Sequence, residues 1–307
     1  MKLTNEQQSV FKDEGYLLVE DLFSDADLQP VIDEISEEID RRSRELVSTG
    51  DLSREYSEEG FETRLTRITA ETQKLYWGIC SGQLSGKAIF GLLTHPSLLD
   101  LAESLLGPEM IASSAYRLRP KVPVFFHGVV PWHQDSGYFE PFCDRALILT
   151  VWIPLVDATR ERGCLQVMPR VHRSNVFRHG SDATGHYLEI APDDLPSAEI
   201  ISVPVCKGGA LLLTNRTPHR STDNLTDVVR WSMDFRYQAA DLPTNFRGAG
   251  GAPFHTPAEN EPVACYPPEA DLLVRSRERP VDVVSDWRRF VTLRQKHVPA
   301  PLTARWR

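Results

Sequence analysis

The side chains with the clearest chemical potential lie in the segment 132–139, where one glutamine separates a histidine from an aspartate. If this segment is extended, His133 and Asp135 point to the same side, because side chains alternate along a strand. Together they offer one imidazole nitrogen and one carboxylate oxygen to a single ion. A His-x-Asp triplet occurs by chance in many proteins, so a metal site requires a further ligand from elsewhere in the chain.

A second imidazole is available at His219, which follows the apolar run 210–214. Two histidines and one carboxylate on one face of a metal leave positions open for other ligands and oxygen, which is typical of non-haem Fe(II) oxygenases. His133, Asp135 and His219 are therefore the candidate metal ligands. Four other histidines lie in polar stretches and are expected at the surface: His179, His186, His255 and His297.

Residues 228–238 form a predicted strand with two different faces. Val229, Trp231, Met233, Phe235 and Tyr237 make one apolar face, and Arg230, Ser232, Asp234 and Arg236 make a polar one. A row of polar residues on one strand face indicates a ligand-holding interior, where Arg230 would grip a carboxylate with its planar guanidinium. The alternative is a salt-bridged strand, with an Arg230–Asp234 or an Asp234–Arg236 pair.

These residues must be positioned by a β core behind a helical N-terminal layer. Residues 1–109 are predicted to be mostly helical. Thr4 and Gln7 form a capping box for a first helix that Gly15 ends, and further helices follow Ser24 and Pro96. The run 16–19 has strand character. Residues 41–72 are rich in Ser, Glu and Arg, and are expected to form a solvated loop or frayed helix, with a mobile flap over a site as the alternative.

From about residue 110 to 238, short apolar runs alternate with turn signals, which predicts an antiparallel sandwich or barrel. Glycine patterns for binding nucleotides are absent from the sequence. Residues 239–263 are rich in Pro, Gly and Asn and are expected to form a long loop that is either functional or disordered, and a helix is expected near 286–295. We therefore expect one domain over residues 1–307, with 239–307 as a lid loop and C-terminal segment.

Composition narrows the class of protein. Of 307 residues, 41% are hydrophobic and 25% are charged, which suits a packed globular core. The net charge of −9 argues against a general nucleic-acid or anionic-membrane binder. The longest apolar runs are too short for a membrane span, no signal peptide is evident, and the five scattered cysteines suit reduced thiols. These features favour a cytoplasmic location.

With these residues in view, the chain resembles the phytanoyl-CoA dioxygenase family of Fe(II)- and 2-oxoglutarate-dependent oxygenases over roughly residues 4–238. Four blocks carry the resemblance in the family's order. They are 11–19 at the N-terminus, 132–139 around the metal ligands, 149–155 with 162–169 in the next two strands, and 208–213 continuing through His219, Ser221, Asn224 and Arg230.

The resemblance implies a cofactor set and a fold. His133, Asp135 and His219 would be the iron ligands, and Arg230 with Ser221 would hold the distal carboxylate of 2-oxoglutarate. Gln134 and Trp152 match positions that line the cosubstrate pocket. The implied fold is a double-stranded β-helix, a distorted cupin-like jelly roll with helices outside it.

The sequence departs from the family pattern in three places. Arg162 stands where the family usually has Asn, Arg170-Val171 where it has Gly-Ser, and Arg220 where it often has Gly. None of these changes removes a ligand. Arg220 either directs a charge toward the site or points outward to solvent.

The implied reaction uses Fe(II), 2-oxoglutarate and O2 to hydroxylate or otherwise oxidise an unactivated C–H bond, and releases succinate and CO2. Because Asp135 is present, halogenation is disfavoured: related halogenases have a small residue there. We expect a small natural-product or amino-acid-like substrate, chosen by residues 41–77 and 239–263, where Phe246, Arg247, Phe254 and His255 suit an apolar body with a polar handle.

Two alternatives from other classes stay open at this point. One is a catalytically silent jelly-roll module that binds or senses a ligand. The other is an enzyme that uses a different divalent metal at the same site.

Overall fold

The structure is a computed structural model that describes residues 1–80, 84–113, 116–123, 125, 128–139, 141–183, 187–240 and 271–296. Its helices are α1 (Asn5–Glu14), α2 (Asp25–Ser48), α3 (Arg64–Glu71), α4 (Lys74–Cys80), α5 (Lys87–Leu93), α6 (Pro96–Leu106) and α7 (Trp287–Lys296). Its strands are β1 (Tyr16–Val19), β2 (Met110–Ser113), β3 (Arg117–Lys121), β4 (Leu149–Pro154), β5 (Leu165–Val167), β6 (His179–Ser181), β7 (Leu188–Ile190), β8 (Ile201–Val203), β9 (Ala210–Thr214), β10 (His219–Ser221), β11 (Arg230–Ala239) and β12 (Asp271–Arg275).

The strands form antiparallel sheets that pack on one another. Within the described ranges the largest sheet has seven strands, in the order β1-β9-β4-β11-β2-β12 with β3 also paired to β11. A smaller sheet has the order β10-β5-β8. Apolar side chains from both sheets meet between them, including Trp152 and Leu211 from the large sheet and Leu165 and Val203 from the small one. This arrangement confirms the predicted antiparallel β core.

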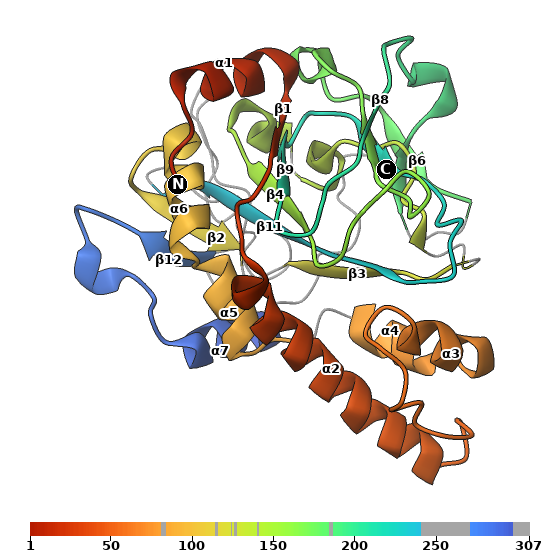
Figure 1. Ribbon diagram of the computed structural model, residues 1–307. Helices are drawn as coiled ribbons and strands as arrows, with labels where there is room; N and C mark the ends of the chain where they lie inside the picture. The colour runs from red at the N-terminus through yellow and green to blue at the C-terminus, as the bar shows by residue number, and fades with distance from the viewer. Residues whose placement is uncertain are drawn as a thin grey trace.

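The helices cover the other face of the large sheet, as the predicted alternation in β11 requires. Helices α2, α5, α6 and α7 lie along one side of that sheet (Figure 1). Trp231, Phe235 and Tyr237 are fully buried among apolar helix residues, and the Tyr237 hydroxyl donates a hydrogen bond to the Leu93 carbonyl at 2.6 Å. The apolar face of β11 therefore supports the helical layer and leaves its polar face for the interior of the jelly roll.

The first helix confirms its predicted boundaries and leads directly toward the metal site. The Thr4 hydroxyl accepts a hydrogen bond from the Gln7 amide, and the Gln7 side chain accepts one from the Thr4 amide. Gly15 ends the helix at φ 83°. The Gly15 carbonyl then accepts hydrogen bonds from the Thr214 amide at 3.1 Å and the Thr217 hydroxyl at 2.5 Å. The turn at Gly15 thus anchors the segment that carries His219.

We expect Gly15→Ala to lower the free energy of unfolding by about 3 kcal/mol, as left-handed backbone strain and overpacking add together. A β-carbon at this position would lie 2.3 Å from His172 Nδ1 and 2.9 Å from Thr217 Oγ1. Gly50 is the matched control, because it has φ 75° with nothing within 4 Å of the added carbon. Gly50→Ala should therefore show the strain alone, about 1 kcal/mol. Urea denaturation measures the free energy of unfolding of both variants. Equal losses in the two variants would contradict the predicted steric clash at position 15.

Residues 41–72, expected to form a solvated loop or frayed helix, are helical at both ends. Helix α2 continues to Ser48, and α3 occupies Arg64–Glu71. Leu65 and Ile68 are fully buried, and Arg64 is also buried, with its guanidinium donating to the Glu55 carbonyl at 3.0 Å. A polar composition concealed the few apolar positions, three residues apart, that pack a short helix.

The C-terminal predictions have mixed outcomes. Helix α7 at Trp287–Lys296 confirms the helix expected near 286–295. The proposed lid residues Phe246, Arg247, Phe254 and His255 lie outside the described residues, as do His186 and His297. In the described part of the chain, no helix combines the length and the apolar character needed to cross a membrane.

Candidate metal centre

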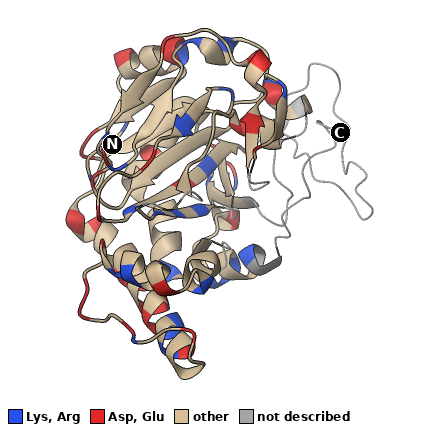
Figure 2. Ribbon diagram, turned by 90° about the vertical axis from the view of Figure 1, so that its right-hand side faces the viewer, with Lys and Arg blue, Asp and Glu red and all other residues tan. Residues whose placement is uncertain are grey.

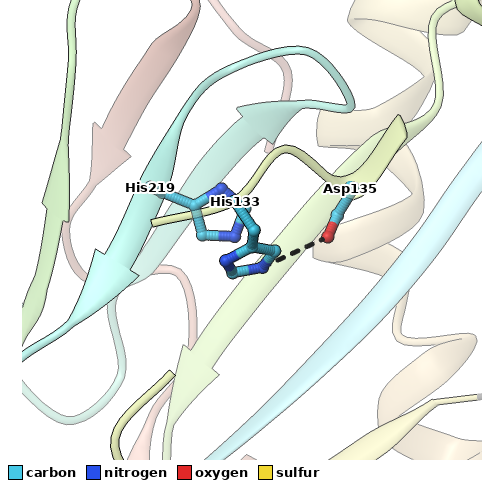
Figure 3. A group of neighbouring side chains, drawn as sticks. All are labelled: His133, Asp135 and His219. Carbon is cyan, nitrogen blue, oxygen red and sulfur yellow. Dashed lines mark ion pairs between the residues drawn. The ribbon is translucent and has the colours of Figure 1, made fainter. Parts of the chain in front are cut away.

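The three candidate ligands come from two segments that main-chain hydrogen bonds join. The His133 amide donates to the His219 carbonyl at 3.0 Å, and the His219 amide donates to the His133 carbonyl at 2.9 Å. The expected extended conformation persists through Gln134 and ends at Asp135, which begins a short 3-10 turn. One ligand atom from each side chain lies within 4.8 Å of the others, and all three residues are buried. Figure 3 shows the two rings side by side, with the carboxylate directed toward His133.

Hydrogen bonds to the main chain determine which ring nitrogens face the site. His133 Nδ1 lies 2.9 Å from the Pro131 carbonyl, and His219 Nδ1 lies 2.9 Å from the Thr217 carbonyl. A carbonyl oxygen only accepts, so each Nδ1 carries the proton and each Nε2 keeps its lone pair. His133 Nε2 lies 3.8 Å from Asp135 Oδ1. Two imine nitrogens and one carboxylate oxygen thus converge, a donor set that suits Fe(II).

The protonation states of all three side chains favour the binding of a cation. Burial lowers the pKa of His133 well below its ordinary value, with a contribution from His219, and burial also lowers the pKa of His219. Burial alone would raise the pKa of the Asp135 carboxyl, but Arg236 and the two histidines hold it below its ordinary value. The histidines are therefore neutral and the aspartate is ionised at neutral pH, so a metal displaces no protons.

Two neighbours orient the Asp135 carboxylate. Thr150 in β4 donates to Oδ2 at 2.6 Å, and Arg236 in β11 donates to Oδ1 at 3.1 Å. Partners of this kind around a metal ligand fix its rotamer and tune its charge. The sequence placed Arg236 on the correct strand face, but its pairing with Asp135 was not predicted.

The two histidines of the triad line a cavity between the large and small sheets. Arg230, Ser221 and Trp152 line it together with both histidines. The Arg230 guanidinium lies 5.2 Å above the Trp152 ring. The predicted cosubstrate residues Arg230, Ser221 and Trp152 therefore lie around one space with the candidate ligands.

Arg230 is a buried cation with spare hydrogen-bonding capacity. It donates to the Ser232 hydroxyl and, at 3.3 Å, to the Gly163 carbonyl, whereas its Nε is buried without a partner. Burial lowers its pKa to about 9, and the charge of Arg119 acts in the same direction. A buried, unpaired donor is costly, so the site favours an anionic ligand here.

The salt-bridge alternative holds for one part of β11 only. Asp234 lies 3.4 Å from Arg236 and 3.5 Å from Arg119. Within the described part of the chain no carboxylate lies within ion-pair distance of Arg230, so the predicted Arg230–Asp234 pair is not formed. Along the polar face of β11, Asp234 and Arg236 therefore form ion pairs, whereas Arg230 forms none with the described residues.

Ser221, which lines the cavity, contacts a buried lysine that the sequence did not single out. Its hydroxyl accepts hydrogen bonds from the Val130 amide and from Lys121 Nζ, both at 2.9 Å. Lys121 is buried, and burial, followed by the charge of Arg230, lowers its pKa to about 6. The signal was present in the sequence, since Arg117, Arg119 and Lys121 alternate with apolar residues in β3.

Gln134 takes a different place from the one predicted. Its side-chain amide donates to the Arg216 carbonyl at 2.7 Å and accepts from the Phe177 amide at 2.8 Å, and it does not line the cavity. Its backbone amide donates to Nε2 of His179, which is buried although the sequence suggested a surface position. Alternation explains this placement: the neighbours of Gln134 face the metal site, so Gln134 faces the opposite way.

The departures from the family pattern are accommodated locally. Arg162 pairs with Glu62 at 2.7 Å, which ties its loop to the helical layer. Arg170 adopts φ 66°, a left-handed conformation suited to Gly, and ion pairs with Glu14 and Glu199 hold it there. Arg220 lines the cavity and donates to the Gln166 side chain at 2.8 Å.

Comparison with known proteins agrees with this architecture. The sequence model of one family, described as Phytanoyl-CoA dioxygenase (PhyH), matches residues 11–232. A Danio rerio protein named phytanoyl-CoA dioxygenase domain-containing protein 1 is 25% identical over 274 residues, which cover 78% of this chain and 91% of the relative. These matches confirm the resemblance inferred from the sequence.

Solved structures confirm the predicted jelly-roll fold. The apo structure of ThoJ, called a non-heme monooxygenase, aligns with a TM-score of 0.56 and 17% identity over 94% of this chain and 98% of its own. The epimerase SnoN, solved with Fe3+, alpha ketoglutarate and nogalamycin RO, aligns with a TM-score of 0.51 and 22% identity over 84% of this chain and 96% of its own. At these identities the comparison concerns the fold alone.

Proposed function

Because this chain belongs to the phytanoyl-CoA dioxygenase (PhyH) family, we propose that it is an Fe(II)- and 2-oxoglutarate-dependent dioxygenase. In this proposal it hydroxylates an unactivated C–H bond of a small organic substrate and converts 2-oxoglutarate and O2 into succinate and CO2. The observation that carries the proposal is the combination, in one cavity, of a two-histidine, one-carboxylate group and a buried arginine with an unpaired donor.

His133, Asp135 and His219 would hold the iron. Their donor types fit it, the ring nitrogens and carboxylate oxygen that face the site carry no proton, and Thr150 and Arg236 keep the carboxylate in place. When bound, Fe(II) and 2-oxoglutarate would together activate O2 for oxidation of the substrate. The protein's own contribution is to orient these groups and to exclude water, for which Leu165 and Leu213 line the same cavity.

Arg230 would receive the distal carboxylate of 2-oxoglutarate through its guanidinium, in a bidentate or charge-assisted hydrogen bond. Ser221 lines the same cavity and accepts a hydrogen bond from Lys121, and Trp152 borders the guanidinium. Gln134 would position the metal ligands indirectly, because its side chain joins the segment that carries His133 and Asp135 to the main chain at Phe177 and Arg216.

The carboxylate at position 135 favours hydroxylation over halogenation, because it occupies the metal position that a halide would need. SnoN is named an epimerase, so a related fold is associated with an outcome other than hydroxylation. Analysis of the product by mass spectrometry separates them. Hydroxylation adds one oxygen atom, whereas epimerisation leaves the mass unchanged.

Anaerobic titration of the Fe(II)-loaded protein with 2-oxoglutarate tests the proposal. We expect a weak, saturable charge-transfer band in the visible range, followed by succinate release once O2 is admitted. If iron binds and the fold is intact but no band develops, the site does not chelate 2-oxoglutarate and the proposal fails.

A further inference from the structure

A second cavity adjoins the metal cavity between α4 and β3. It measures about 950 Å³ counted to its open mouth. Arg119, Gly128 and Val130 line both cavities. A molecule bound in the second cavity therefore lies next to the space in front of His133 and His219.

The second cavity is cationic because two arginines line it, together with Lys121, whose pKa of about 6 leaves it largely uncharged at neutral pH. Arg117, Arg119 and Lys121 line it, and their register opposite Asp234, Ser232 and Arg230 turns all three toward the polar face of β11. Among the described residues that line it there is no aspartate or glutamate. In Figure 2, Lys and Arg positions lie within the strands of the core as well as on the helices. A concentration of positive charge inside a protein of net charge −9 indicates an anionic ligand.

The carboxylate that forms an ion pair with Arg119 is only partly available to it. Asp234 is shared between Arg119 and Arg236, and Arg236 is also bound to Asp135. In the part of the chain that the structure describes, the Arg117 guanidinium has no hydrogen-bond partner. Burial lowers the pKa of Arg117, and the charge of Arg119 acts in the same direction. Arg117 therefore offers an unused planar fork for an oxoanion.

Aromatic side chains form another part of the wall. Tyr76 contacts Trp77 edge-on, with ring centroids 5.2 Å apart, and Phe125 edge-on at 4.7 Å. Tyr76, Trp77 and Tyr187 all line the cavity. Such a wall suits a flat, apolar body beside the charged group.

We propose that this cavity is the substrate subsite, in which Arg117 and Arg119 bind a carboxylate or phosphate group of a substrate whose flat apolar body packs against Tyr76 and Trp77. This inference deepens the proposed function and rests on it for the reaction, although the binding step is separable. Binding of the anionic group holds the far end of the substrate in the second cavity. A carbon atom nearer the other end of the substrate then faces the metal cavity, past the residues that line both cavities.

Isothermal titration calorimetry on the full-length protein tests the subsite. The probes are 3-phenylpropionate, phenyl phosphate and the neutral 3-phenylpropanamide, each measured on the protein as purified and after loading with Fe(II) and 2-oxoglutarate under argon. At least one anion should bind saturably and lose affinity as NaCl rises, and the amide should bind at least about tenfold more weakly. The relative affinities of the two anions identify the carboxylate or the phosphate as the natural group.

Substitutions assign the binding to named residues. Arg117→Gln should weaken the anion about tenfold and Arg117→Lys less, because lysine keeps the charge but not the fork. Arg67→Gln is the matched control, since Arg67 is exposed and pairs with Glu59. Equal binding of the amide, an unchanged affinity in Arg117→Gln, or no binding of either anion would overturn the inference. Anion binding without the 2-oxoglutarate band would instead refute the proposed function and leave the subsite standing.

Discussion

Replacing His219 with alanine is expected to remove iron binding and turnover while the fold persists. Two ligands remain in this variant, and even changes around a metal ligand cost about 10–100-fold in metal affinity, so we expect a loss greater than about 100-fold. The side chain makes one hydrogen bond, to the Thr217 carbonyl, and the bridge to His133 uses main-chain atoms. Stability should therefore fall by only about 1–2 kcal/mol. Iron content after anaerobic loading and succinate release measure the effect.

His95→Ala is the matched control for this variant. His95 lies at the start of α6, where its ring accepts from the Ser97 amide and contacts Asp27. It should lose some stability and no iron. Asp135→Ala should also abolish turnover, but it removes one of the two carboxylates that pair with Arg236, so a loss of stability would confound the activity measurement. Normal iron content and turnover in His219→Ala would disprove the ligand assignment.

The sequence predicted those parts of the fold that local patterns encode. The Thr4 capping box and the alternation of β11 each depend on residues close together in the chain, and both are present. The three candidate ligands and Arg230 were recognisable because their chemistry is unusual for buried positions.

Long-range pairing could not be inferred in the same way. Arg236 reaches Asp135 only because β11 pairs with β4, whose Thr150 lies opposite Arg236. Lys121 reaches Ser221 because β3 pairs with the other edge of β11. No spacing in the sequence specifies which strands become neighbours. The same limit applies to Gln134, whose direction depends on the main-chain bridge between His133 and His219.

Replacing Arg230 with methionine is expected to raise the 2-oxoglutarate requirement by roughly 100-fold, since removing one partner of a buried charged hydrogen bond typically costs 2–5 kcal/mol. Iron content should not change, because the three metal ligands are untouched. Stability without 2-oxoglutarate should be equal or higher, since the buried Arg230 carries an unpaired Nε and an apolar side chain avoids that cost. Titration of the charge-transfer band, thermal denaturation and steady-state kinetics give the three readouts.

The combination of these readouts distinguishes a cosubstrate anchor from a structural arginine. A structural Arg230 would lower the melting temperature on substitution and leave the 2-oxoglutarate titration unchanged. An anchor predicts the reverse, with Arg230→Lys intermediate, because lysine keeps the charge but cannot present two parallel donors. Arg178→Met is the control for loss of an arginine, since Arg178 is exposed and pairs with Asp194. A 2-oxoglutarate requirement in Arg230→Met equal to that of Arg178→Met would return Arg230 to a packing role. In that case the unpaired Arg230 Nε would have to bind an anion other than 2-oxoglutarate.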